Sequence, residues 1–194
     1  DRGFSFRLDG LLDMRFDPTH GQTAADLVNT LDETDLADII WRYGEERYSR
    51  RIARAILRAR PLYTTGDLAE VVRGALGRTK EKQDPATRTF QALRIAVNNE
   101  LKTVEQAIPS LIELLHPNGR LAVISFHSLE DRLVKQAFKR ESIDCICPPE
   151  QPVCTCGHKA SVRILTSKPI TAAEEEVESN PRSRSAKLRA VEKI

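Results

Sequence analysis

Four cysteines close together in the sequence suggest the most distinct chemistry of this chain. They form two Cys-x-Cys pairs, Cys145 with Cys147 and Cys154 with Cys156, within twelve positions. Four thiolates at this spacing could form a tetrahedral zinc site, although zinc knuckles more often use Cys-x-x-Cys. A loop of free thiols is the alternative. A disulfide is less favoured in a reducing compartment, and no base is evidently placed to activate a catalytic cysteine.

A histidine and a serine follow the short apolar run from Leu121 to Phe126. The run predicts a strand buried on both faces, as in parallel sheets. Ligands of open α/β sheets bind beyond the carboxyl ends of the strands, so His127 and Ser128 are candidate pocket residues. Ser128 and Asp131 also fit a capping box at the start of a helix, whereas His127 has no such local explanation.

Five arginines gather on one side of a predicted helix over residues 45–60. At about 100° per residue they occupy one arc with no acidic residue among them, beside an apolar side that includes Tyr48 and Ile52. Arginine suits paired hydrogen bonds to phosphate, so the arc is a candidate contact to an RNA backbone. A solvated helix face is the alternative. The five residues are Arg47, Arg50, Arg51, Arg54 and Arg58.

A second arginine-bearing segment lies at residues 180–185, Asn-Pro-Arg-Ser-Arg-Ser. Asn180, Arg182 and Arg184 could clasp a phosphate there, and an ordinary polar loop is the alternative. The nine glycines form no Gly-x-Gly, so the sequence has no dinucleotide or nucleoside fingerprint.

The elements that must position these residues change in type along the chain. Residues 1–22 predict an irregular loop with little to bury. Apolar periodicity then predicts a helix from about residue 30 to Tyr43, the helix over 45–60, and a third helix after Thr65. A polar linker over 77–84 precedes a helix that starts at Asp84-Pro85 and continues until Pro109 interrupts it. After the strand at 121–126 we expect a helix over 129–140 and strands over 161–166 and 186–192, with an acidic stretch between those two strands.

The bulk composition is that of a soluble globular protein. Hydrophobic residues make up 40% and charged residues 30% of 194 residues, and the net charge is +2. No apolar run is long enough to span a membrane, and no signal peptide is present, so we expect a cytoplasmic protein without a membrane partner. The chain opens at Asp1, and its one methionine is Met14. We therefore expect the natural start to lie upstream.

Five segments, taken in order, carry a specific resemblance. They are GFSFRLDGLLDMRFDP (3–18), YGEERYSRRIARAI (43–56), PATRTFQALRIAVNNEL (85–101), GRLAVISFHSLEDRLVK (119–135) and NPRSRSAKLRAVEK (180–193). Together they resemble one enzyme family, the bacterial 16S rRNA (cytosine-N4)-methyltransferases. The resemblance covers essentially the whole chain, and the Cys pairs are similar to those of one subset of the family.

This resemblance implies an α/β fold: the C-terminal part of a class I (Rossmann-like) methyltransferase sheet, with an inserted all-helical domain that helps to recognise RNA. We assign residues 1–22 to a loop of the methyltransferase domain and 23–84 to the helical insert. Residues 85–194 form the rest of the methyltransferase domain, with a Cys-rich loop over 145–158. The implied reaction is transfer of a methyl group from S-adenosyl-L-methionine to the N4 of a cytidine in the decoding region of 16S rRNA. The implied partner is the small ribosomal subunit; a homodimer stays open.

The resemblance places the family's glycine-rich cofactor loop upstream of Asp1, so we expect these residues alone to be inactive. His127 and Ser128 would line the substrate pocket, and Phe4, Phe6 and Asp9 would border the cofactor. The remaining expected contacts to RNA are Arg7 and Arg15 in the first loop and Arg88, Gln91 and Arg94 on one helical face. A non-catalytic RNA-binding module derived from the same family is the alternative function.

Overall fold

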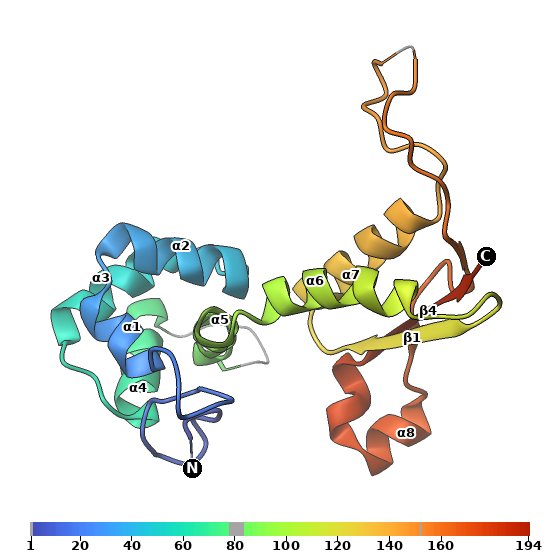
Figure 1. Ribbon diagram of the computed structural model, residues 1–194. Coiled ribbons are helices and arrows are strands. Elements are labelled where there is room, and N and C mark those ends of the chain that lie inside the picture. Colours follow the sequence, from blue (N-terminus) through green and yellow to red (C-terminus); the bar gives the residue numbers. More distant parts are fainter. Residues whose placement is uncertain (1, 78–83, 152) are drawn as a thin grey trace. The chain divides into compact units, whose positions relative to one another are not determined.

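The computed structural model describes residues 2–77, 84–151 and 153–194 (Figure 1). The chain divides into two compact units, Asp1–Glu100 and Leu101–Ile194, and each unit has its own hydrophobic core. Most of the polar linker predicted over residues 77–84 lies outside the described residues, and so does Pro152 of the Cys-rich loop. No helix among the described residues is both long and apolar enough to cross a membrane.

The first unit is built from short helices, several of which begin at a side-chain cap. Thr23 and Thr64 each form a capping box with the aspartate three residues later, and Asp32 accepts a hydrogen bond from the backbone N–H of Asp35 at 2.8 Å. The first helix has only seven residues, too few to show a clear apolar period, and the sequence did not predict it. The helices are α1 (Ala24–Thr30), α2 (Glu33–Gly44), α3 (Ser49–Ala59), α4 (Thr65–Leu76) and α5 (Ala86–Asn98).

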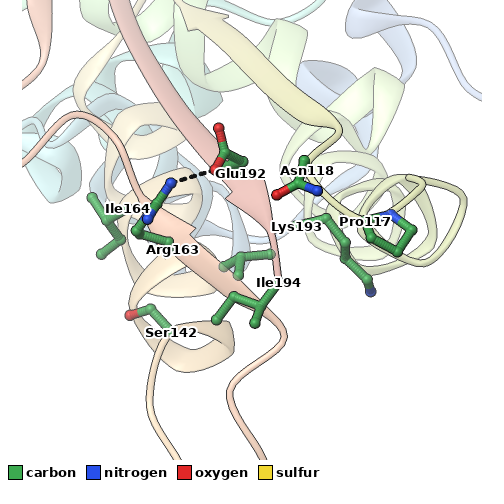
Figure 2. Close-up of a pocket in the computed structure, with 9 residues that line it drawn as sticks. Pro117, Asn118, Ser142, Arg163, Ile164, Glu192, Lys193 and Ile194 are labelled. Atoms are coloured by element: carbon green, nitrogen blue, oxygen red, sulfur yellow. Dashed lines mark hydrogen bonds and ion pairs between the residues drawn. The ribbon is translucent and has the colours of Figure 1, made fainter.

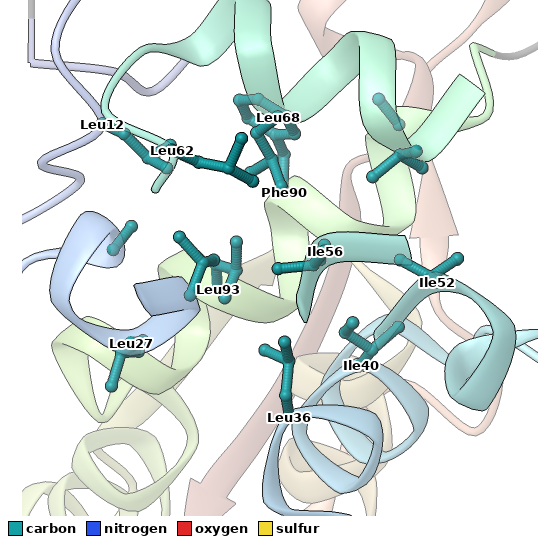
Figure 3. Packing of buried hydrophobic residues seen from close by; sticks show 14 of the residues in the cluster. Leu12, Leu27, Leu36, Ile40, Ile52, Ile56, Leu62, Leu68, Phe90 and Leu93 are labelled. Atoms are coloured by element: carbon teal, nitrogen blue, oxygen red, sulfur yellow. The ribbon is translucent and has the colours of Figure 1, made fainter. Parts of the chain in front are cut away.

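Apolar side chains from all of these helices meet in one core (Figure 3). Ile40 of α2, Ile56 of α3, Leu68 of α4 and Leu93 of α5 are fully buried. The segment before α1 is irregular, as predicted, but the expectation that it buries little is wrong. Leu12 and Met14, each 1% exposed, anchor it in this core. Its aromatic and charged residues mask this apolar content in the sequence.

The long helix predicted from Asp84 to Pro109 is two helices. α5 ends at Asn98, and Asn99 adopts a left-handed backbone conformation with φ 50°. α6 (Glu100–Glu113) begins directly afterwards and contains Pro109. The predicted breaker is therefore accommodated inside a helix, and the break falls at an asparagine, a residue that tolerates left-handed φ better than most.

The second unit contains a small sheet in which β4 (Lys187–Lys193) is the central strand. β1 (Arg120–Ser125), β2 (Val162–Ile164) and β3 (Ile170–Thr171) each pair with β4 in antiparallel orientation. β1 and β2 therefore run in the same direction, and α7 (Ser128–Glu141) connects them. The predicted strands at 121–126, 161–166 and 186–192 are confirmed within a few residues, and the α/β class is confirmed with them.

Helices cover one face of this sheet. Ile108 and Ile112 of α6 and Val134 and Phe138 of α7 pack with Val191 of β4 in the second core. The prediction that β1 is buried on both faces is wrong: Ile124 is 55% exposed and Phe126, just after the strand, is 56% exposed. Exposed residues alternate with partly buried or buried ones along the strand, because an antiparallel sheet covered by helices on one side shields every second residue.

The acidic stretch before β4 is the short helix α8 (Glu174–Ser179), which the sequence did not predict. Three glutamates in its first turn suit the positive end of a helix. A 3-10 helix, η1 (Pro181–Ser185), follows and leads into β4.

Candidate functional site

The arginines of the predicted arc do share the exposed side of α3 and the residues just before it. Ile52, Ala53 and Ile56 are fully buried on the opposite side of this helix. We call the exposed set the arginine face: Arg47, Arg50, Arg51, Arg54 and Arg58.

Acidic groups neutralise little of the arginine face. Arg54 Nε lies 3.0 Å from Glu33 Oε1 of α2, and both side chains are about half exposed, at 57% and 43%. This acidic neighbour comes from another helix, and Glu33 is close to Arg54 in space and not in sequence. Within the described part of the chain, Arg50, Arg51 and Arg58 form no ion pair. These three side chains are available to an anionic ligand.

Two exposed aromatic side chains stand beside the arginine face. Trp41 is 56% and Tyr48 45% exposed, and both line a pocket of about 560 Å³ together with Arg47, Arg50 and Arg51. The Arg47 guanidinium lies 4.6 Å from the centre of the Tyr48 ring. Tyr48 was expected on the apolar side of the helix, and Trp41 was not predicted as a site residue. The sequence did contain a signal for Trp41, because this large aromatic residue lies outside the apolar period of α2.

The face formed by Arg88, Gln91 and Arg94 on α5 is engaged within its own unit. Gln91 donates to the backbone carbonyl of Tyr43 at 3.1 Å. Arg88 Nη1 lies 3.3 Å from Glu46, and Arg94 makes two bonds to Glu100, at 2.8 and 3.0 Å. These contacts hold helices and their ends together. An RNA contact by these three residues stays a prediction.

The carboxylate of Asp9 holds the first turn of α4. Its Oδ1 accepts hydrogen bonds from the backbone N–H groups of Gly66 at 2.8 Å and Gly10 at 3.0 Å, and from the Thr65 hydroxyl at 3.3 Å. The Gly66 hydrogen bond is the main reason that the pKa of Asp9 lies below its ordinary value.

Asp13 and Arg15 form a two-bond pair at 2.7 and 3.0 Å, which lowers the pKa of Asp13.

The aromatic residues of the first segment form two separate ring contacts. Phe4 stacks on Phe16 with ring centres 5.6 Å apart, and Phe6 meets Phe90 edge to face at 4.9 Å. Arg7, the residue after Phe6, is exposed. Phe4 and Phe6 are thus used in two separate ring contacts, and Asp9 in hydrogen bonds to the start of α4.

The first turn of α7 is capped by His127. Its Nδ1 accepts a hydrogen bond from the backbone N–H of Glu130 at 3.3 Å, and the Glu130 carboxylate accepts one from Phe126 N–H at 2.8 Å. The predicted capping box of Ser128 and Asp131 is wrong by one position. His127 therefore has the local structural role that the sequence did not suggest.

Asp131 faces the sheet and pairs with β4. Its carboxylate accepts two bonds from Arg189, at 2.7 and 3.1 Å, and Lys187 Nζ lies 3.7 Å away. Asp131 and Arg189 are both buried. The hydrogen bonds from Arg189 are the main cause that lowers the pKa of Asp131.

The arginines before β4 are presented by η1. Arg182 and Arg184 are exposed, whereas Ser183 between them is buried and donates to the Asn180 carbonyl at 2.8 Å. This places the two guanidinium groups outward on a short ordered turn. Binding of phosphate there stays a prediction.

A pocket of about 600 Å³ lies at the end of the sheet where β2 and β4 meet (Figure 2). Arg163 pairs with Glu192 at its side, and Arg120 also contacts Glu192 at 2.9 Å. These bonds lower the pKa of Glu192, with that from Arg120 the largest cause. Ile164 and Ile194 contribute apolar surface. No residue predicted from the sequence lines this pocket.

The four cysteine sulfurs converge at the loop between α7 and β2. All four lie within 4.8 Å of one another, and none forms a disulfide. Backbone N–H groups of Ile146 and His158 each donate to Cys156 Sγ at 3.5 Å and lower the pKa of Cys156 to about 6. Spacing in the sequence therefore predicted the cluster correctly.

Comparison with known proteins gives one consistent family. A profile described as the MraW methylase family matches residues 1–194. A protein named ribosomal RNA small subunit methyltransferase H from Geobacter sp. strain M21 is 56% identical over 199 residues, covering 100% of this chain and 64% of the relative. Proteins of the same name from Thermomicrobium roseum and Dehalococcoides mccartyi are each 55% identical, with 60% and 56% of their lengths covered.

The chain thus spans between 56% and 64% of the length of these curated relatives, without loss of coverage at either of its own ends. The chain belongs to the MraW methylase family.

Proposed function

We propose that the protein transfers a methyl group from S-adenosyl-L-methionine to the exocyclic N4 amine of a cytidine in the decoding region of 16S rRNA. The observation that carries this proposal is membership of a methylase family whose relatives are named small-subunit rRNA methyltransferases. Because those relatives are longer than this chain, the activity is proposed for a protein of their length, acting on the small ribosomal subunit in the cytoplasm.

The arginine face and its two aromatic neighbours support RNA as the substrate. Single-stranded nucleic acid is bound by positive charge along its backbone and by aromatic side chains under its bases. The pocket beside α3 combines both, with Trp41 and Tyr48 next to Arg50 and Arg51. Methyl transfer to a base also requires the base to be unstacked, so a surface that holds single-stranded RNA fits the reaction. Arg7, Arg15, Arg182 and Arg184 are proposed as additional phosphate contacts.

The reacting amine needs positioning more than it needs a base. The lone pair of the cytosine N4 is delocalised into the ring, so the amine must be held in line with the methyl group that it attacks. We propose that His127 and Ser128 lie beside the cytosine, because they follow β1 at the end of its strand.

The cofactor residues proposed within this chain fit less well. Asp9 is engaged by Gly66 and Gly10, Phe6 by Phe90, and Phe4 by Phe16. These contacts do not form a nucleoside pocket, so no step of the reaction is assigned to them. The parallel direction of β1 and β2, linked by α7, supports the proposal that this sheet belongs to a doubly wound α/β domain.

Methyl transfer is tested with the full-length protein, labelled S-adenosyl-L-methionine and small ribosomal subunits that lack the modification. We expect label at the N4 of one cytidine, located by mass spectrometry of RNA fragments. Binding to the subunit without any transfer would contradict the enzyme and support the RNA-binding module.

The arginine face is tested by the double substitution Arg50→Gln/Arg51→Gln. Loss of two phosphate contacts should weaken RNA binding and reduce the slope of log affinity against log salt by about 1.4, at roughly 0.7 per contact on single-stranded RNA. The matched control is Arg42→Gln on α2, because Arg42 already pairs with Asp38 at 3.0 Å. An equal effect of the control would argue against a specific role of the arginine face.

A further inference from the structure

The loop between α7 and β2 has no apolar interior to hold it. Among its described residues, no helix or strand occurs between Glu141 and Val162, and no side chain is buried. Its apolar residues Ile143, Ile146 and Val153 are 38%, 37% and 69% exposed. In Figure 1 the loop runs away from the sheet and returns to it. A loop this long with a defined path needs a restraint other than hydrophobic burial.

Hydrogen bonds close the loop at its base. Ser161 N–H donates to the Glu141 carbonyl at 2.8 Å, and the Ser161 hydroxyl donates to the Glu141 carboxylate at 2.9 Å. Farther out, Ala160 N–H donates to Asp144 Oδ1 at 3.1 Å. These bonds bring the two cysteine pairs to the same level of the loop, beyond its base.

The sulfur positions match a common metal centre better than two disulfides. Cys145 Sγ lies 3.4 Å from Cys154 Sγ and 3.9 Å from Cys156 Sγ, and Cys154 and Cys156 are 3.6 Å apart. Four sulfurs at about 2.3 Å from one zinc ion would lie about 3.8 Å from each other in a tetrahedron. Cys147 supplies the fourth sulfur within 4.8 Å of the other three.

The surroundings of Cys156 have the form expected around a thiolate ligand. Two backbone N–H groups, from Ile146 and His158, point at its sulfur. Gly157 has φ 63°, a left-handed conformation that turns the chain so that the His158 N–H can reach back. The His158 ring is directed elsewhere, since its Nε2 lies 2.9 Å from the Arg140 carbonyl. The donor set is therefore four cysteines without histidine.

We propose that Cys145, Cys147, Cys154 and Cys156 bind one zinc ion in a closed, four-coordinate site that fixes the loop between α7 and β2. All four positions are filled by protein, so the site is structural and leaves no place for a substrate or an activated water. Soft thiolate ligands in tetrahedral arrangement favour zinc among the common divalent metals. Binding releases thiol protons to solvent and changes no oxidation state.

Elemental analysis of the purified full-length protein tests the site. After dialysis against zinc and removal of unbound metal, we expect about one zinc ion per chain in the wild type and below roughly a tenth in Cys145→Ser/Cys154→Ser. The control Val153→Ala changes an exposed side chain of the same loop and should keep its zinc. Substitution with Co²⁺ should give the intense visible absorption of a tetrahedral thiolate complex.

A second measurement keeps the proposal separate from folding of the variant. Trypsin cleavage after Lys159 in the wild type should be at least about tenfold faster once a chelator has removed the metal, because the loop loses its restraint. Three results would overturn the proposal: four alkylatable thiols with no bound metal, disulfides in protein prepared anaerobically with reductant, or iron in place of zinc.

Discussion

The side chain of His127 has a structural role in the first turn of α7 and a proposed role beside the cytosine. Its Nδ1 accepts the Glu130 N–H, and Phe126 N–H is taken by the Glu130 carboxylate. Substitution by alanine would remove the cap and the imidazole together. A side chain that keeps the cap but lacks the imidazole separates the two roles.

Asparagine at position 127 would keep the cap of α7 without the imidazole, because it is among the preferred N-cap residues. We expect His127→Asn to keep its free energy of unfolding within about 0.5 kcal/mol of the wild type, whereas His127→Ala loses about 1 kcal/mol. If the imidazole lies beside the cytosine, kcat/KM for methyl transfer in His127→Asn should fall at least about tenfold. Unchanged transfer by the asparagine variant would leave His127 with the structural role alone.

The buried pair of Asp131 and Arg189 makes stability depend on pH. Arg189 lowers the pKa of Asp131. The Asp131 carboxylate therefore binds a proton more weakly in the native state than in the unfolded chain. The stabilisation is complete above the ordinary aspartate pKa of about 3.9 and is lost as pH falls through the lower native pKa.

Asp131→Asn should therefore lower the free energy of unfolding by about 3 kcal/mol at neutral pH, since it leaves a buried guanidinium without its anion. The difference from the wild type should shrink as urea denaturation is repeated from about pH 5 down to pH 2. Glu178→Gln on the exposed face of α8 is the control and should differ little at any pH. A difference of constant size across the pH range would show that Asp131 acts by packing and not by charge.

At the scale of elements, the sequence predicted those helices and strands that are determined by interactions between residues close in sequence. Apolar periodicity predicted α2, α3, α4 and α7, and β-rich runs predicted β1, β2 and β4. The break at Asn99 was missed because an asparagine in a helical pattern gives no distinct signal, whereas Pro109 gives a strong one and yet lies inside α6. The one-sided burial of β1 was missed because an apolar run does not tell which faces are covered.

In the candidate site, too, groups of residues close in sequence were predicted and contacts between residues distant in sequence were not. Spacing alone gathered the five arginines and the four cysteines, because each set lies on one element or one loop. Partners distant in sequence could not be predicted: Glu33 beside Arg54, Glu46 beside Arg88, and Arg189 beside Asp131. Trp41 could be recognised as a site residue only in the structure, where α3 places the arginine face beside it.

Packing between α2 and α5 depends on a glycine. A Cβ at Gly44 would lie 2.6 Å from the Arg88 carbonyl oxygen, a backbone atom that cannot move without moving α5. Gly44→Ala should therefore cost about 1–3 kcal/mol of unfolding free energy in chemical denaturation. Gly74 in α4 has open space around its Cβ position, so Gly74→Ala should stabilise by up to about 1 kcal/mol. A change of the unfolding free energy in the same direction for both substitutions would contradict this account.

At the scale of the whole molecule, the chain has two cores that share no residue. The core of the first unit gathers α1 to α5 and the segment around Leu12, whereas that of the second gathers α6, α7 and the sheet. No local pattern predicts this division, since α5 and α6 are almost continuous in sequence. Each core can therefore respond to a cavity by itself, as long as opening of one unit does not require opening of the other.

Hydrogen exchange tests this independence through one cavity in each core. Leu93 and Val191 are both 0% exposed, so Leu93→Ala should cost about 2–5 kcal/mol and Val191→Ala about 2 kcal/mol. Leu93→Ala should accelerate exchange of the amides of α2, α3 and α5 and leave α7 and β4 unchanged, and Val191→Ala should do the reverse. Equal acceleration of both units by either substitution would mean that the two cores unfold as one cooperative structure. Separate responses would mean that the helix carrying the arginine face can be destabilised without loss of the sheet that leads to His127.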